Sequence, residues 1–119
     1  MNFSKKSTET ETYVNDEVSL EIRNESIDNS GLVLLISNKT NTDLSYDSTY
    51  YIEQKKNGVW YSSDNEPYFN ALAILLESKA TNEFEVDFEI TLPQGEYRII
   101  KPINVSTGSI PLMVDFKIS

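Results

Sequence analysis

The stretch Glu83-Phe84-Glu85-Val86-Asp87-Phe88-Glu89-Ile90 decides the fold of this chain. Apolar and acidic residues alternate through it, so Phe84, Val86, Phe88 and Ile90 share one face and the carboxylates share the other. A helix has a period of 3.6 residues and would scatter both sets around its circumference. The stretch therefore predicts a β-strand with an apolar face toward a core and a row of carboxylates toward solvent.

The same period of two recurs on both sides of this stretch. Val18, Leu20 and Ile22 alternate with polar residues, and a turn at Asp28-Asn29-Ser30-Gly31 separates them from the run Leu32–Ile36. That run is apolar at every position, which is typical of a central strand covered on both faces. Tyr97–Ile100 and Met113–Ile118 add two further expected strands. In the last one, Val114, Phe116 and Ile118 share a face.

The strongest short hairpin signal is Lys55-Lys56-Asn57-Gly58, between the expected strands Tyr50–Gln54 and Val59–Ser62. Asn-Gly is preferred in two-residue hairpin turns because both positions need a positive φ, so Gly58 is expected to be a structural residue. The segment Tyr68–Leu76 suits either a strand or a short buried helix, and we expect a strand.

Together these signals predict an all-β fold, an antiparallel β-sandwich of about seven to eight short strands. We expect residues 17–119 to form this domain. Residues 1–16 are rich in Ser, Thr and Glu and contain few apolar residues after Phe3, which predicts a flexible polar tail or tether.

Composition excludes several classes of function. The 119 residues include no Cys and no His, which removes disulfides, Cys/His zinc sites and imidazole-dependent catalysis. The net charge of −9 and the absence of a basic stripe argue against nucleic acid as a partner. We expect no enzyme activity, no cofactor and no metal site.

Two groups of carboxylates have alternative readings as calcium ligands. The row Glu83, Glu85, Asp87, Glu89 stands apart along a strand, whereas a calcium cage needs six to eight converging oxygens, so we expect a solvated face that discourages edge pairing. The spacing of Asp43 and Asp47 matches no calcium loop, and turn chemistry explains them better.

Aromatic residues in the middle of the chain form the candidate interaction surface, which consists of Tyr46, Tyr50, Tyr51, Trp60 and Tyr61. Tyr and Trp are enriched in contact surfaces, and adjacent Tyr50 and Tyr51 cannot both point into one core. The alternative is that these rings cap one end of the sandwich and support the hairpin.

The segment Leu92-Pro93-Gln94-Gly95-Glu96-Tyr97 resembles the tyrosine corner of immunoglobulin-like sandwiches. In that arrangement the ring packs inward and its hydroxyl bonds to backbone a few residues upstream. The resemblance makes Tyr97 and Gly95 structural residues.

Over about Val18–Ile118 the chain is similar to the Ig-like domains of Gram-positive cell-envelope proteins and lipoproteins. The motifs are Ile36-Ser37-Asn38-Lys39-Thr40, Asn57-Gly58-Val59-Trp60-Tyr61, the acidic strand and the corner segment. The resemblance implies a non-enzymatic binding or spacer module at the cell surface, whose partner is a protein or another surface component. Its membrane contact would be an N-terminal anchor outside this sequence. The alternative is a cytoplasmic proteinase inhibitor that acts by loop insertion.

Overall fold

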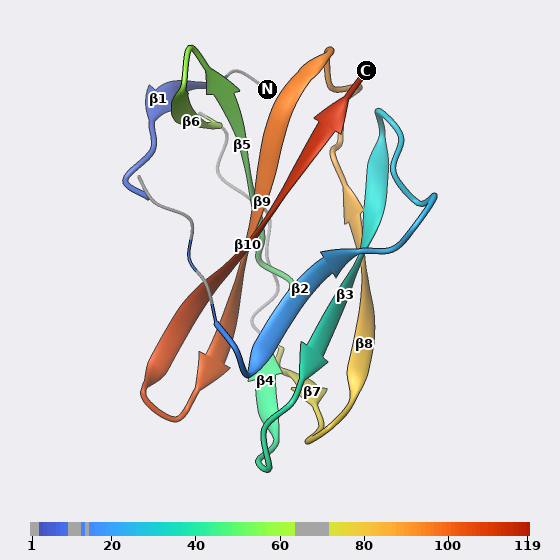
Figure 1. Cartoon of the computed structure of the whole chain (residues 1–119), viewed down its shortest axis with the longest axis vertical. Coiled ribbons are helices and arrows are strands. Elements are labelled where there is room, and N and C mark those ends of the chain that lie inside the picture. The colour runs from blue at the N-terminus through green and yellow to red at the C-terminus, as the bar shows by residue number, and fades with distance from the viewer. Residues whose placement is uncertain (1–2, 10–12, 14, 64–71) are drawn as a thin grey trace.

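Two facing antiparallel sheets make up the computed structural model, which describes residues 3–9, 13, 15–63 and 72–119 (Figure 1). The larger sheet contains β1 (Phe3–Lys6), β4 (Leu44–Tyr46), β5 (Tyr51–Lys56), β6 (Val59–Ser63), β7 (Ile74–Leu76), β9 (Gly95–Val105) and β10 (Gly108–Ile118). The smaller sheet contains β2 (Val18–Ile22), β3 (Gly31–Asn38) and β8 (Thr81–Asp87). The predicted all-β sandwich is confirmed. In the described part of the chain there is no helix of the length and apolarity that a membrane span needs.

The long strand β9 organises the larger sheet. The order of the strands is β1-β6-β5-β9-β4-β7, and β10 pairs with the other edge of β9, while the smaller sheet has the order β2-β3-β8. β9 therefore contacts β5 and β4 on one side and β10 along its whole length on the other. Strands from the middle of the chain and the last strand therefore meet on β9.

The core lies between the sheets and follows the predicted alternation. In β3 every second residue is buried, and Leu34 and Ile36 are fully inaccessible to solvent. The outward residues Val33 and Leu35 are half-buried. β3 is the central strand of the smaller sheet, as expected, and its outer face is only partly covered.

The acidic strand β8 ends earlier than its sequence pattern indicates. Val86 and Phe88 are buried, as predicted, but Ile90 is 38% exposed. The chain leaves the strand after Asp87, and Glu89 takes a positive φ of 65°, which turns the backbone out of the alternation.

The last two strands are longer than predicted. β9 and β10 pair from Gly95 with Ile118 to Val105 with Gly108. Pro102 and Pro111, which lie opposite each other, read as strand breaks in the sequence because proline cannot donate to a ladder. On the edge of β9 away from β10, the residues up to Ile100 pair with β5, and Asn104 pairs with β4. Pro102 lies in the gap between these two pairings. No neighbouring strand needs its missing N–H.

The first described residues differ from the expected solvated tether. Phe3–Lys6 forms β1, which pairs with β6, and Phe3 is buried with its ring edge-on to Tyr97 at 5.7 Å between centroids. The prediction of a tail is wrong here because one buried aromatic and one strand pairing order a segment whose average composition is polar.

Two expectations about local structure are settled by the backbone. Asn57 and Gly58 have φ values of 51° and 78°, which confirms a hairpin turn of the mirror-image type. Ile74–Leu76 is a strand, as expected, and residues 68–71 of the same prediction lie outside the described residues.

Tyr97 has the geometry of a tyrosine corner. Its side chain is fully buried and stacks on Phe116 at 5.4 Å between ring centroids. Its hydroxyl donates a hydrogen bond of 2.6 Å to the carbonyl oxygen of Pro93, four residues upstream. Burial raises the pKa of the Tyr97 hydroxyl. The ring joins the β9–β10 hairpin to the core, and the hydroxyl fixes the turn that precedes β9.

Lys101 is a charged residue on the core side of β9, and it is fully inaccessible to solvent. Its Nζ donates to the carbonyl oxygens of Asp47 at 2.5 Å and Thr49 at 2.6 Å. It also lies 4.9 Å from the ring centroid of Tyr46 and 4.5 Å from that of Phe84, within the range of cation–π contact. Burial lowers the pKa of Lys101 from 10.5 to about 8, although the Asp47 carboxylate opposes the shift.

We predict that Tyr97→Phe lowers the free energy of unfolding by about 1–2 kcal/mol, because it removes one hydrogen bond and leaves a carbonyl without its partner. Tyr97→Ala adds a cavity and is expected to cost about 3–5 kcal/mol. Urea denaturation measures both, and Tyr51→Phe, at an exposed position, is the matched control with an unchanged midpoint. Equal midpoints for all variants and the parent would show that the corner does not support the fold.

The buried amine of Lys101 predicts an unusual dependence of stability on pH. Between pH 8 and pH 10 the folded state has largely lost the proton that the unfolded state still binds, so raising the pH stabilises the protein through this group. Relative to Lys101→Met, the free energy of unfolding of the parent is expected to rise by about 2 kcal/mol from pH 8 to pH 10. The comparison with Lys101→Met removes the pH effects that the two proteins share. Parallel stability curves for the two proteins would contradict this account.

Candidate functional site

The outer face of the larger sheet carries the candidate site. Tyr97, Ile99 and Ile103 of β9 point into the core, so Arg98 and Ile100 point to the opposite face. Both are nevertheless buried, at 1% and 5% exposure. An outer sheet face that buries an arginine must be covered by another part of the chain.

An ion pair between neighbouring strands lies at the centre of this face. Arg98 of β9 and Glu53 of β5 are directly cross-strand, and Glu53 is 4% exposed. The guanidinium donates to Glu53 Oε1 twice, from Nε at 2.8 Å and from Nη2 at 2.6 Å. Burying two charges is costly unless their remaining hydrogen-bonding groups are also satisfied, so the partners around the pair matter.

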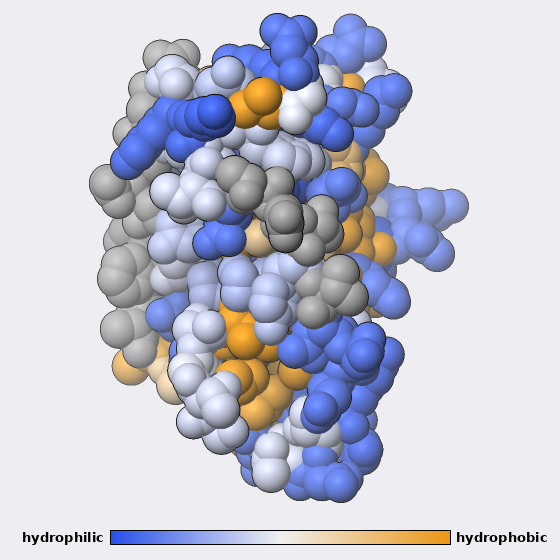
Figure 2. Space-filling model, turned by 60° about the vertical axis from the view of Figure 1, so that its left-hand side comes forward, coloured by the Kyte–Doolittle hydropathy of each residue, from blue (hydrophilic) through white to orange (hydrophobic). Residues whose placement is uncertain are grey.

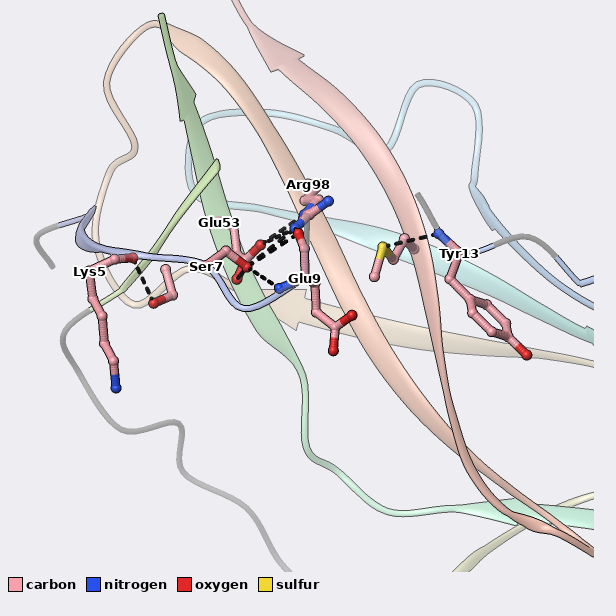
Figure 3. Close-up of polar contacts among 8 residues, drawn as sticks. Lys5, Ser7, Glu9, Tyr13, Glu53 and Arg98 are labelled. Carbon is pink, nitrogen blue, oxygen red and sulfur yellow. Dashed lines mark hydrogen bonds and ion pairs between the residues drawn. The ribbon is translucent and has the colours of Figure 1, made fainter. Parts of the chain in front are cut away.

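The N-terminal segment supplies those partners (Figure 3). Ser7 Oγ donates to Glu53 Oε2 at 2.7 Å, and Arg98 Nη2 donates to the carbonyl oxygen of Glu9. The backbone of Ser7 donates to the carbonyl oxygen of Trp60 at 3.0 Å, and the Glu9 N–H donates to Ser7 Oγ at 3.0 Å. The segment 7–9 is therefore fixed across the sheet by the ion pair.

Trp60 of β6 completes the environment of the arginine. The guanidinium carbon of Arg98 lies 4.5 Å from the centroid of the Trp60 ring. Arg98 Nη1 is buried and has no hydrogen-bond partner among the described residues, and the ring face of Trp60 offers the guanidinium a cation–π contact instead. Trp60 thus acts as a support for Arg98 from within the sheet.

A groove of about 530 Å³ lies beside the ion pair on the same face. Its apolar floor is formed by Tyr51, Ile100, Pro102 and Pro111. One wall is formed by the N-terminal residues Lys5, Lys6, Thr8 and Glu9, and the rest of the rim by Glu53, Ser62, Ser63 and Ser109. The volume lies in the range of ligand-binding grooves, and polar residues outnumber apolar ones in the lining.

A second hollow of about 800 Å³ lies where the loop Thr40–Asp43 approaches the Ser106-Thr107 turn. Its apolar lining includes Leu44, Leu75 and Ile110. In Figure 2, which turns the β1 side forward, most of the surface is hydrophilic and the apolar surface gathers mainly in the lower half. The groove beside Arg98 is the better candidate because it combines two lysines with the exposed ring of Tyr51, whereas the charged residues in the lining of the second hollow are Glu17 and Asp43.

The structure separates the five aromatic residues predicted to form one interaction surface. Tyr51 lies on the outer face, is 44% exposed and lines the groove. Trp60 lies on the same face but supports Arg98. Tyr50 and Tyr61 pack against the core, and the Tyr50 hydroxyl donates to the carbonyl oxygen of Asp87 at 2.5 Å.

Tyr46 is a correction to that prediction. It is 2% exposed, lies in the core and accepts a hydrogen bond from Asn82 Nδ2 at 3.1 Å, so it cannot contact a partner. Alternation along a strand places neighbouring aromatics on opposite faces, and composition alone does not reveal which face is covered.

The carboxylates considered as calcium ligands have other contacts. Asp43 accepts a hydrogen bond from the Ser78 N–H at 2.9 Å, and Asp47 accepts one from the Thr49 N–H at 2.8 Å, which lowers the pKa of Asp47. In the acidic row, Glu83 pairs with Arg23 at 2.5 Å. Among the described residues, no group of three or more acidic side chains is placed to hold a metal ion.

Sequence reasoning missed Ser7, Glu53, Arg98 and Lys101. A lone charge within a strand normally faces solvent, so Glu53 and Arg98 gave no signal of burial. Lys101 did give one: it is in phase with Tyr97, Ile99 and Ile103, which places it on the core face. Ser7 falls in the segment expected to be a tether.

We predict that the ion pair is strongly non-additive. Arg98→Met or Glu53→Leu alone leaves one buried charge without compensation and is expected to cost about 3–5 kcal/mol of unfolding free energy. The double variant removes both charges and is expected to lie within about 2 kcal/mol of the parent. Thermal and urea denaturation of the four proteins complete the cycle, in which Arg23→Met/Glu83→Leu, at the exposed pair, is the control with weak coupling. Additive losses at Arg98 and Glu53 would contradict the description of a buried, mutually dependent pair.

The comparisons with known proteins agree with this architecture. The family model described as "Bacterial Ig-like domain" matches residues 14–117, which is most of the chain. The match includes β2 to β10, and thus both sheets and the strands that carry Glu53 and Arg98. No curated protein matches the chain. The chain belongs to the bacterial Ig-like domain family.

Proposed function

We propose that this domain is a non-enzymatic binding module of a bacterial cell-surface protein and that the groove beside Arg98 binds a segment of a partner protein. The observation that carries the proposal is Tyr51. It is a large aromatic side chain that is 44% exposed and forms part of the apolar floor of the groove. Tyrosines in such positions are enriched among the residues that dominate binding energy.

The rigidity of the site supports a binding role. Tyr51 pairs with Ile100, and Pro102 pairs with Pro111, so the floor is built on three adjoining strands rather than on loops. The wall is fixed by the ion pair and by Ser7. A preformed surface loses little conformational entropy when a partner binds, which favours affinity.

The family supports the remaining parts of the proposal. An Ig-like sandwich positions a surface without contributing a catalytic constellation, and function resides in sites placed on it. We infer a location outside the cell, in a Gram-positive envelope protein or lipoprotein, from the resemblance of the sequence to such domains. No contact among the described residues favours the alternative of a cytoplasmic proteinase inhibitor, so we do not propose that function.

A peptide selection tests the proposal. The 119-residue protein is immobilised and used to select from a phage-displayed library of random dodecapeptides. The dissociation constants of the synthesised peptides are then measured for the parent and for Tyr51→Ser. Loss of an aromatic anchor at the centre of a contact typically costs at least tenfold in affinity. We expect that loss for Tyr51→Ser.

Leu75→Ser is the matched control, because Leu75 is a large apolar residue, 55% exposed, that does not line the groove. Its affinity for the peptides should stay within twofold of the parent. Failure to select any peptide, or equal affinities of the parent and Tyr51→Ser, would show that the groove is not a protein-binding site.

A further inference from the structure

We infer that the partner segment is acidic: the groove takes an extended polypeptide that places a carboxylate beside Lys5 and Lys6 and an apolar side chain on the floor at Tyr51. This inference rests on the proposed function and adds the chemistry of the partner to it.

The two lysines of the wall are the first support. Lys5 and Lys6 are exposed in β1 and line the groove. Among the described residues the ion pairs are Arg23 with Glu83 and Arg98 with Glu53, so neither lysine pairs with a carboxylate of the described part of the chain. Figure 3 shows the Lys5 ammonium directed away from the ion pair. The groove therefore presents cations that this part of the chain leaves unpaired.

The distribution of the carboxylates explains how an anionic protein can attract an acidic segment at this place. Glu53 is neutralised by Arg98, and Glu96 and Asp115 on the same face line a separate hollow together with Lys55 and Lys117. Glu21, Glu83 and Glu85 belong to β2 and β8, on the outer face of the opposite sheet. Two packed sheets are about 10 Å apart, and the Debye length in physiological salt is about 8 Å, so the field of those carboxylates is largely screened at the groove.

The Glu9 carboxylate determines at which end of the wall an acidic group of the partner can bind. Glu9 lies on the same wall as the lysines, and Figure 3 shows its carboxylate directed away from Arg98. It repels a second acidic group at its own end of the wall. The partner's carboxylate is therefore expected near Lys5 and Lys6, and removal of the Glu9 charge should strengthen binding.

The floor selects a polypeptide rather than a nucleic acid. Tyr51, Ile100, Pro102 and Pro111 offer apolar surface, and the two prolines have no N–H to donate. Two lysines are far too few to neutralise a phosphate backbone on a chain with a net charge of −9. A peptide with a carboxylate flanked by apolar side chains can contact both the lysines of the wall and the apolar floor.

The test uses the peptides selected on the parent protein. Asp and Glu are expected to be enriched next to an apolar residue. Lys5→Gln/Lys6→Gln is expected to weaken binding by about fivefold to tenfold at 50 mM NaCl, a loss that shrinks at 500 mM NaCl because salt screens exposed charges. Lys39→Gln/Lys79→Gln changes the net charge equally, away from the groove, and should stay within twofold. Glu9→Gln should bind about twofold more tightly.

Urea midpoints of all variants establish that each is folded. If Tyr51→Ser loses tenfold while the Lys5/Lys6 variant binds within twofold of the parent, the proposed function stands and the acidic partner is wrong. If Tyr51→Ser loses nothing, or no peptide is selected, the proposed function itself fails. Selection of basic peptides, or measured binding of a 12-nucleotide single-stranded DNA that depends on Lys5 and Lys6, would also overturn the inference.

Discussion

The ion pair between Arg98 and Glu53 is the interaction on which the candidate site depends. It lies on the outer face of a sheet and yet is almost completely buried. Charges in that position are stable only when their hydrogen-bonding groups find partners, and those partners come from Ser7, Glu9 and the Trp60 ring. The pair thus requires the N-terminal segment to cross the sheet. The segment that satisfies it is also the wall of the groove, so the electrostatics of two strands determine whether a binding surface exists.

The same design separates the stability of the sandwich from the properties of the site. Tyr97, Phe116 and Phe3 hold the core from the inner face of β9, β10 and β1, and alternate residues of β9 face outward to the groove. Substitutions at exposed Tyr51, Lys5 or Lys6 can therefore change binding without entering the core. Lys101 is the exception on the inner face, where an amine takes a position that a leucine or methionine would fill in an ordinary core. Its two backbone carbonyl partners connect β9 to the loop before β5.

Much of the sandwich was predictable from the sequence, because period-two alternation and turn residues are local signals. They located β2, β3, β6, β8 and the Asn57-Gly58 turn, and the corner segment identified Tyr97. Several failures depend on what covers a face. Tyr46 is buried and Val33 is half-buried because of packing between elements that the local pattern does not contain. The N-terminal segment is ordered by the buried ring of Phe3 and by the contact of Ser7 with Arg98, which is 91 positions away in the sequence. For the candidate site, Tyr51 was predicted as an interaction residue, but the groove that it lines was not predicted.

The central claim is that the N-terminal segment is an ordered wall of this site, and amide hydrogen exchange followed by NMR tests it most directly. In the structure the Ser7 N–H donates to the Trp60 carbonyl oxygen, and the Glu9 N–H donates to Ser7 Oγ. The account predicts that both amides exchange much more slowly than in an unstructured peptide, and that Arg98→Met/Glu53→Leu accelerates them while the amides of Leu34 and Ile99 remain protected. Exchange of Ser7 and Glu9 at the rate of an unstructured peptide in the parent protein would contradict it.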